Sequence, residues 1–337
     1  MRADRYNCAM LAAPYAQLTP DCIMDAVDAT GHRCDGRLLA LNSFENRVYQ
    51  VGQEDGPALI AKFYRPARWS DAAILEEHAF THALAAAEIP AVPPLVIGGQ
   101  TLFSHDGYRF ALFERRGGRA PELDDPAVLE WIGRFIGRIH AVGAAQPFAH
   151  RLTLDIATWG EAPRDFVLAG NFVPPELLAP YTVAVNRALD AVRAAFERAG
   201  DVRALRLHGD CHPGNIMWTD AGPHFVDLDD CCNGPAIQDL WMLLGGDRDE
   251  MRGKLLDVLA GYEDFMPFDV RELHLIEPLR TLRLIHYSAW LARRWDDPAF
   301  PAAFPWFGTH AYWQEQITTL HDQCERMAGP TLWQGNA

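Results

Sequence analysis

The sequence lacks the features that mark membrane-spanning, secreted and disulfide-bonded proteins. No run approaches the roughly 18 uncharged apolar residues that a membrane helix needs. The start MRADRYNCAM has no apolar segment leading to a small-residue cleavage site. The seven cysteines, at positions 8, 22, 34, 211, 231, 232 and 324, are odd in number and include no Cys-x-x-Cys pair. These absences predict a cytoplasmic protein with reduced thiols and no membrane partner.

A basic character is also absent. The chain has 30 Lys and Arg against 45 Asp and Glu, for a net charge of −15. This balance argues against nucleic acid as a partner, because sequence-independent binding depends on cations that neutralise phosphates. No Gly-x-x-x-x-Gly-Lys-Ser/Thr loop occurs, so the P-loop plan of ATP binding is missing. The oligomeric state is not encoded in these patterns, and a monomer is the working expectation.

The 337 residues, 49% of them hydrophobic, are enough for one large domain or two moderate ones. Residues 1–113 read mainly as antiparallel strands, with Asp-Gly turns that predict two hairpins at 46–64 and 101–113. Between the hairpins a helix is expected from Ser70 to the residue before Pro90. Residues 114–120 are predicted to be a hinge linker, and residues 121–337 a mainly helical lobe. The sequence therefore predicts a two-lobed α+β fold.

One short hairpin interrupts the helical half. Residues 216–218 and 224–226 are β-rich and flank the turn TDAGP. Asn215 precedes the first strand and Asp227 follows the second, so we expect their side chains at the open end of the hairpin. A carboxamide and a carboxylate form a hard, all-oxygen site that suits Mg²⁺. Asp210, five residues before Asn215, is placed to accept a proton from a hydroxyl group.

The first half of the chain contributes a candidate ion pair. Lys62 is the single cation in the apolar strand ALIAKFY, so it requires an anionic partner. Glu77 is a candidate, because it shares a helical stripe with Ile74, Phe80 and Leu84. Glu76, its neighbour, remains the alternative.

The order of Asp210, Asn215 and Asp227 reproduces the arrangement of kinase catalytic residues. The motifs HGDCHPGN and VDLDD resemble the phosphotransferase branch of the kinase-like fold, which includes aminoglycoside and choline kinases. More closely, longer motifs between Thr19 and Trp313 resemble the bacterial stress-response serine/threonine protein kinases of this superfamily. Those motifs are LNSFENRVYQV, KFYRPARW, ILEEH, LRLHGDCHPGNI, FVDLDDCCNGPAIQDLWMLL and AWLARRWDDPAFP.

The resemblance implies phosphoryl transfer from ATP to a serine or threonine hydroxyl of a protein. It makes Asp210 the proton acceptor, and Asn215 and Asp227 the Mg²⁺ ligands, with Asp227 also counted as catalytic. It makes Lys62 and Glu77 the pair that orients the phosphates, in a cleft where adenine lies against the linker.

Three further residues are expected to support this site. Ser43 falls in the nucleotide-covering loop LNSFENRVYQV, which has no glycine, so Ser43 or Asn46 is expected to contact phosphate through its side chain. Asp239 is expected to brace the catalytic loop, and His208 to hold the backbone of that loop by hydrogen bonds.

Alternative functions remain open at this point. Only eleven residues separate Asp227 from Asp239, which leaves no room for a long activation segment and favours a small-molecule alcohol as the acceptor. A nucleotide-binding regulator without catalysis is a further class. A zinc site would use His208, Cys211 and His212 with Cys231 or Cys232, although paired ligand spacing is lacking. The adjacent cysteines could sense oxidation or be buried thiols, and the aromatic segment 290–313 could dock a substrate or form core.

Overall fold

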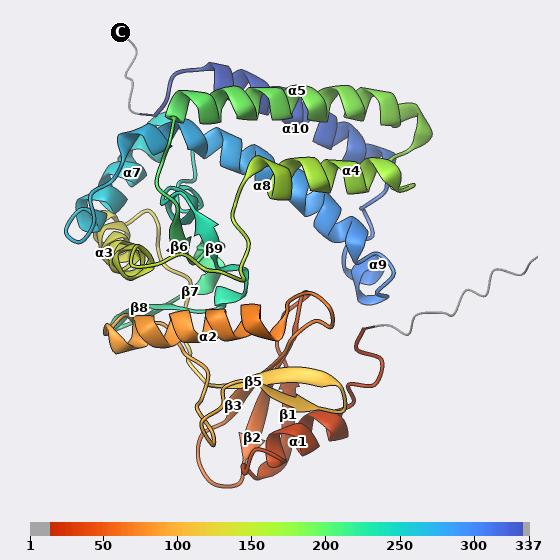
Figure 1. Cartoon of the computed structure of the whole chain (residues 1–337), viewed down its shortest axis with the longest axis vertical. Helices are drawn as coiled ribbons and strands as arrows, with labels where there is room; N and C mark the ends of the chain where they lie inside the picture. Colours follow the sequence, from red (N-terminus) through yellow and green to blue (C-terminus); the bar gives the residue numbers. More distant parts are fainter. Residues whose placement is uncertain (1–13, 333–337) are drawn as a thin grey trace, which may run out of the picture.

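The computed structural model describes residues 14–332, so Cys8 and the start of the predicted N-terminal lobe lie outside the described residues. The chain forms two lobes (Figure 1). The lower lobe in this view holds β1–β5, α1 and α2, and the upper lobe holds nearly all the other helices. The predicted two-lobed α+β fold is confirmed.

The N-terminal lobe is built on a five-stranded antiparallel sheet in the order β1-β2-β3-β5-β4. Both Asp-Gly turns close hairpins, because β2 pairs with β3 and β4 pairs with β5. Apolar side chains of the sheet pack against Ile23 and Val27 of a helix that precedes it. The strands are β1 (Cys34–Ala40), β2 (Arg47–Gln53), β3 (Leu59–Phe63), β4 (Phe103–His105) and β5 (Tyr108–Glu114), and the helix is α1 (Pro20–Asp28).

The predicted helix between the hairpins is α2 (Asp71–Ala86). Ser70 caps it, since its hydroxyl accepts a hydrogen bond from the backbone N–H of Ala73 at 3.2 Å. The helix ends before Pro90, as expected from the clash of proline with a preceding turn.

The C-terminal lobe is mainly helical. Its helices are α3 (Pro126–Gly143), α4 (Ala162–Ala169), α5 (Pro175–Ala199), α6 (Gln238–Trp241), α7 (Arg248–Tyr262), α8 (Ile276–Arg293), α9 (Ala299–Ala303) and α10 (His310–Ala328). α3 and α7 approach closely because Gly133 faces the backbone of Val258, where a Cβ atom would overlap the carbonyl oxygen. Within residues 14–332, no helix combines the length and apolarity required to cross a bilayer.

Two small sheets sit among these helices. The predicted hairpin is present as β7 (Ile216–Thr219) and β8 (Gly222–Phe225), and β6 (Leu205–Leu207) pairs with β9 (Cys232–Gly234). The aromatic segment largely forms core, because Phe300, Phe307 and Trp313 are buried. Strands β7 and β9 and helix α8 contribute side chains to the face that the C-terminal lobe presents to α2 and β3.

Candidate active site

A cleft of about 1240 Å³ separates the lobes. At the end nearest residues 114–120 its walls are apolar: Val48, Ile60, Val92, Phe113 and Met217. The opposite end is polar, and carries Lys62, Asp210, Asn215, Asp227 and Asp230. An apolar slot that opens onto charged groups matches the shape and polarity of a nucleotide.

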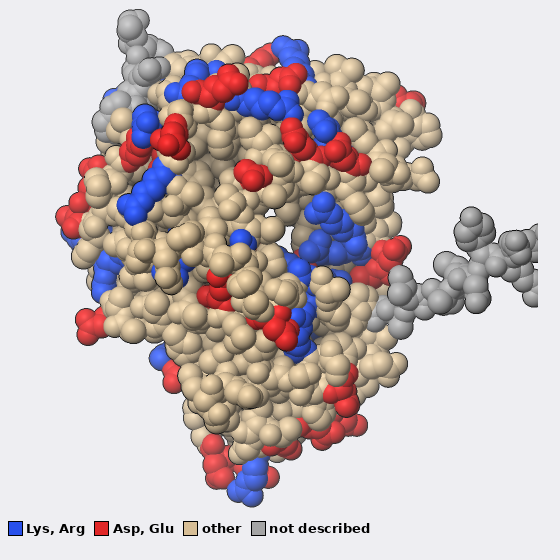
Figure 2. Space-filling view, viewed as in Figure 1, with Lys and Arg blue, Asp and Glu red and all other residues tan. Residues whose placement is uncertain are grey.

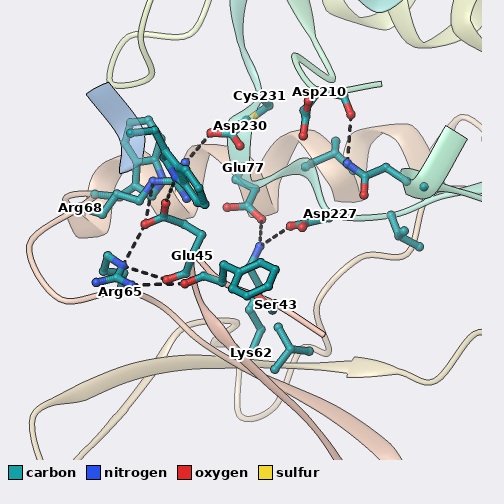
Figure 3. A pocket seen from close by; sticks show the side chains of 18 of the residues that line it. Ser43, Glu45, Lys62, Arg65, Arg68, Glu77, Asp210, Asp227, Asp230 and Cys231 are labelled. Atoms are coloured by element: carbon teal, nitrogen blue, oxygen red, sulfur yellow. Dashed lines mark hydrogen bonds and ion pairs between the residues drawn. The ribbon is translucent and has the colours of Figure 1, made fainter. Parts of the chain in front are cut away.

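Lys62 is the centre of the charged end (Figure 3). Its Nζ lies 3.4 Å from Glu77 Oε1, 3.0 Å from Asp227 Oδ1 and 3.2 Å from Asp229 Oδ1. Burial disfavours the ammonium form, but the attraction of these carboxylates outweighs it and raises the pKa of Lys62 well above its usual value. The lysine is therefore a fixed cation at the floor of the cleft.

The two adjacent glutamates of α2 have different partners. Glu77 is buried, faces Lys62 and lies 3.7 Å from Arg151 Nη2. Glu76 instead accepts hydrogen bonds from the backbone N–H groups of residues 149–151 at 2.7, 2.7 and 3.0 Å. Successive helical residues point about 100° apart, which explains why only one of them reaches the strand lysine.

Asp239 fixes the turn that carries Asp210. Its Oδ2 accepts the backbone N–H of His208 and its Oδ1 that of Gly209, both at 2.8 Å. His140 Nε2 lies 3.0 Å from the same carboxylate, which is fully enclosed. Gly209 has φ of +85°, and a Cβ atom there would overlap the Asp230 carbonyl oxygen. The turn thus depends on a glycine and on a buried carboxylate.

His208 links the loop that follows β6 to the residue that follows β8. Its Nε2 lies 3.0 Å from the Val226 carbonyl, which only accepts, so Nε2 carries the proton. Nδ1 is then the acceptor for the backbone N–H of Asp210 at 3.4 Å. Both ring nitrogens are occupied, and the thiols of Cys211, Cys231 and Cys232 are buried with raised pKa values. These contacts oppose a zinc site and a redox-active cysteine pair.

Asp210, Asn215 and Asp227 line one end of the cleft. The backbone N–H of Val226 donates to Asn215 O at 3.1 Å, so Asp227 follows the residue paired with Asn215. Asp227 has φ of +58°, a left-handed conformation that is strained in a non-glycine residue and turns its chain away from β8. The side chain of Asp227 is 54% exposed.

Asn215 and Asp227 have the donor set for a hard cation. The Asn215 amide nitrogen donates to the Asp210 carbonyl at 3.0 Å, which leaves the amide oxygen as the ligand atom. With the Asp227 carboxylate it offers oxygen only, and the open cleft leaves room for phosphate and water ligands. The residues present therefore fit Mg²⁺.

Asp210 faces an arginine that the sequence analysis did not identify. Arg283 Nη1, from α8, lies 2.7 Å from Asp210 Oδ1, and His212 Nε2 lies 3.5 Å from Oδ2. Burial raises the pKa of Asp210, but Arg283 and His212 outweigh it and hold the pKa below its usual value. Asp210 is therefore an ionised acceptor of hydrogen bonds.

The loop before β2 is joined to the other lobe. Ser43 lines the cleft and donates its hydroxyl to Asn46 O at 3.2 Å. Asn46 is buried, and its amide oxygen accepts the backbone N–H of Arg65, which directs it away from a phosphate. Glu45 contacts Arg65 Nε at 3.1 Å and Arg294 Nη2 at 2.5 Å, and Trp290 Nε1 donates to it at 2.6 Å. The loop thus borders the cleft and is joined through Glu45 to the C-terminal lobe.

Four further charged residues complete the site and were not identified from the sequence: Arg68, Arg151, Asp229 and Asp230. Arg68 forms ion pairs with Asp229 and Asp230. Despite burial, Arg68 and Lys62 hold the pKa of Asp229 well below its usual value. The motif VDLDD contained the two aspartates, but their arginine partners lie more than 70 positions away in sequence.

Comparison with known proteins agrees with this geometry. Residues 37–276 match the model of a family described as the phosphotransferase enzyme family. The chain is 47% identical to stress response kinase A of Escherichia coli O157:H7 over 95% of this chain and 97% of that protein. It is 46% identical, with the same coverage, to serine/threonine protein kinase RdoA of Salmonella typhimurium strain LT2.

A solved structure shares the fold. Amicoumacin kinase hAmiN in complex with AMP-PNP, Ca²⁺ and Ami matches with a TM-score of 0.70 and 19% identity, over 88% of this chain and 90% of that chain.

Proposed function

Because the chain belongs to the phosphotransferase enzyme family, we propose that it is an ATP- and Mg²⁺-dependent serine/threonine protein kinase of the bacterial stress response. The observation that carries this proposal is the convergence of Lys62, Asn215 and Asp227 with an ionised Asp210 in one cleft. The names of the relatives support the stress-response role and the protein substrate.

The nucleotide binds in the slot between the lobes. Adenine packs between Val48, Ile60 and Met217 against the linker that begins at Glu114. The phosphates extend toward Lys62, whose orientation Glu77 fixes at 3.4 Å. The loop that carries Ser43 covers them.

Asn215 and Asp227 would hold Mg²⁺, which when bound would neutralise negative charge on the phosphates. The protein provides mainly position and electrostatics, because the transferred phosphoryl group passes through a loose transition state. Lys62 therefore has two tasks, to attract phosphate and to balance the acidic floor of the cleft.

Asp210 orients the acceptor. Its carboxylate accepts a hydrogen bond from the substrate hydroxyl and aims the oxygen at the γ-phosphorus for in-line attack. It takes the proton as the new O–P bond forms, while the bond from the γ-phosphorus to the β,γ-bridging oxygen breaks and ADP leaves. Arg283 keeps the carboxylate ionised, and Asp239 keeps its backbone in place.

A small-molecule kinase is the second candidate. The observation that favours it is the short path from Asp227 to Asp239, which consists of a 3-10 turn (Leu228–Asp230), β9 and the start of α6. No extended segment within it is available to position a peptide in the manner of an activation loop.

One experiment distinguishes these functions. Purified protein is incubated with Mg·ATP alone, with casein, with myelin basic protein, or with a pool of amino alcohols, sugars and aminoglycosides. ADP release and phosphate incorporation are followed by intact mass. Phosphoserine or phosphothreonine on a protein supports the proposal, and ADP formed only with the metabolite pool supports the second candidate. If ATP is bound but no ADP forms in any arm, the remaining function is a nucleotide-binding regulator without catalysis.

The Asp210→Ala variant tests the role of the base. Turnover should fall by about 10²–10⁴-fold, the usual contribution of a general base, while ATP binding is retained. Asp220→Asn, at the exposed turn between β7 and β8, is the matched control and should keep full activity. An unchanged rate for Asp210→Ala would exclude the assigned role.

A further inference from the structure

The acceptor side of the cleft is lined by one face of α8. Residues 283, 286, 287, 290, 293 and 294 all border the cleft, and their spacing of three and four residues places them on the same helical face. Three of them are arginines: Arg283, Arg293 and Arg294. Figure 2 shows Lys and Arg side chains gathered beside the hollow between the lobes.

The positive charges here differ in how well they are neutralised. Arg294 has Glu45 as a partner at 2.5 Å, yet its Nε is buried without a hydrogen bond among the described residues. Arg283 is 39% exposed and has Asp210 as its carboxylate partner. Arg293 is exposed, packs over the Phe166 ring at 5.1 Å, and has its pKa lowered by desolvation alone. Among residues 14–332, no carboxylate forms an ion pair with Arg293.

The pKa of the neighbouring His286 is affected by the arginines around it. His286 stacks on Trp159 at 4.7 Å, and its Nδ1 is buried without a hydrogen bond among the described residues. Burial and the repulsion of four arginines, led by Arg293 and Arg294, lower the pKa of His286 to about 3. The histidine is therefore neutral, and the charged groups that act on it are arginines.

Acidic groups lie on the other side of the cleft. The carboxylates of Asp227 and Asp230 are 54% and 44% exposed, and they line the end where the nucleotide phosphates and the metal are expected. Arg68 pairs with Asp230 on that side, whereas Arg293 on the α8 side has no carboxylate partner among the described residues.

We propose that the acceptor hydroxyl is carried by an anionic partner, a serine or threonine flanked by carboxylate or phosphate groups, and that Arg293 is the specificity-determining residue that binds this anion. This inference rests on the proposed kinase function and names the acceptor class for it. A guanidinium group binds carboxylate and phosphate through paired N–H donors, and an incoming anion compensates a charge that lacks a partner in the protein. A cationic amino alcohol would be repelled by the same arginines.

The net charge of −15 does not oppose this proposal. Exposed charges are screened over about 8 Å at physiological ionic strength, so a ligand inside the cleft responds mainly to the nearest groups. The contact of an acidic partner with the arginines is electrostatic. Its affinity should therefore fall as the salt concentration is raised.

The test compares three peptides that differ only around a central serine, flanked by glutamate, glutamine or lysine. Initial rates with Mg·ATP give kcat/KM for each. We expect the glutamate peptide to exceed the glutamine peptide by about tenfold, the size of one charge-assisted hydrogen bond, and the lysine peptide to be the poorest. Casein, which is acidic, should likewise exceed myelin basic protein.

Variants then assign the effect to one residue. Arg293→Gln should raise KM for the glutamate peptide by about tenfold while KM for ATP and the rate with the glutamine peptide stay unchanged. Arg293→Glu should shift the preference toward the lysine peptide. The control is Arg252→Gln, an exposed arginine of α7 outside the cleft, which should behave as the wild type.

The outcomes separate this inference from the function on which it rests. Equal rates on all three peptides, or an unchanged KM in Arg293→Gln, would overturn the anionic acceptor and leave the kinase intact. Phosphorylation of a small hydroxy acid, but of no peptide, would support anion recognition and overturn the protein substrate. No ADP with any acceptor would overturn both.

Discussion

At the scale of single residues, the site depends on a lysine surrounded by carboxylates. The chain has two lysines, Lys62 and Lys254. Lys62 is enclosed by three acids, whereas Lys254 contacts the fully exposed Asp124 at 2.8 Å. Since removing one partner of a buried ion cluster leaves uncompensated charge, the two positions should respond very differently to the same substitution.

Lys62→Met should lower the free energy of unfolding by about 3–5 kcal/mol and abolish measurable turnover. The reason is that Glu77 and Asp229 lose their shared cation while buried. Lys254→Met is the matched control and should cost less than about 1 kcal/mol. Urea denaturation of both variants checks this prediction, and equal costs would contradict the buried-cluster account.

At the scale of elements, the loop that carries Asp210 owes its shape to the segment at Asp230 and to helix α6. Gly209 turns the chain with φ of +85° directly against Asp230, and Asp239 of α6 holds the two adjacent N–H groups. Gly36 in β1 has the same φ but faces open space. Substitutions at the two glycines therefore separate the cost of a left-handed backbone conformation from the cost of steric overlap.

Gly36→Ala should cost about 1–2 kcal/mol, the penalty of a left-handed conformation for a residue with a Cβ atom. Gly209→Ala should cost more than about 3 kcal/mol, because the Cβ atom also meets the Asp230 carbonyl, and kcat should fall as Asp210 moves. Thermal unfolding and initial rates of both variants are the measurements. A Gly209→Ala protein with the stability and rate of Gly36→Ala would refute the close packing.

The elements were also where the sequence was most informative. Asp-Gly turns between β-rich segments predicted both N-terminal hairpins, and the turn TDAGP predicted the hairpin at 216–225, because these signals are local. The helix α1, the strand β1 and the pairing of β6 with β9 were not predicted. The last of these joins residues 25 or more positions apart, and such pairing depends on the packed lobe rather than on local pattern.

The site residues also fall into those that local sequence signals could predict and those that only the fold brings together. Asp210, Asn215 and Asp227 lie within 18 positions and could be found together, and Lys62 stood out as a charge in an apolar strand. Arg283 could not be found, because its contact with Asp210 spans 73 positions. In the sequence, Arg283 is spaced along α8 like a solvent-facing arginine. Only the folded structure shows that this face of α8 borders the cleft.

At the scale of the whole molecule, the lobes are fastened by buried charge. Glu45 and Arg65 of the N-terminal lobe meet Arg294 and Asp297 of the C-terminal lobe, with Arg65 Nη2 2.9 Å from Asp297 Oδ2.

A further buried acid, Glu272, supports α6 by accepting the N–H of Ile237 at 2.8 Å. Burial raises the pKa of Glu272 to about 7.

This raised pKa predicts a pH dependence of stability. The native carboxyl group retains its proton above pH 4.5, where the unfolded group has lost it, so the free energy of unfolding falls as pH rises to about 7. The shift corresponds to about 3 kcal/mol. Glu272→Gln should make the free energy of unfolding nearly independent of pH over this window. At pH 8 the variant should be more stable than the wild type. Urea midpoints from pH 4 to pH 8 measure the effect, and parallel profiles would contradict it.

We propose that one cleft transfers the phosphoryl group from ATP to a protein hydroxyl through Asp210. The most direct test of this proposal is the intact mass of casein after incubation with Mg·ATP and either the wild type or the Asp210→Asn variant, with ADP measured in the same samples. The account predicts phosphoryl groups on serine or threonine with an equal amount of ADP for the wild type, and neither for the variant. Phosphorylation of casein at the same rate by both proteins, or ADP released without any phosphorylated protein, would contradict it.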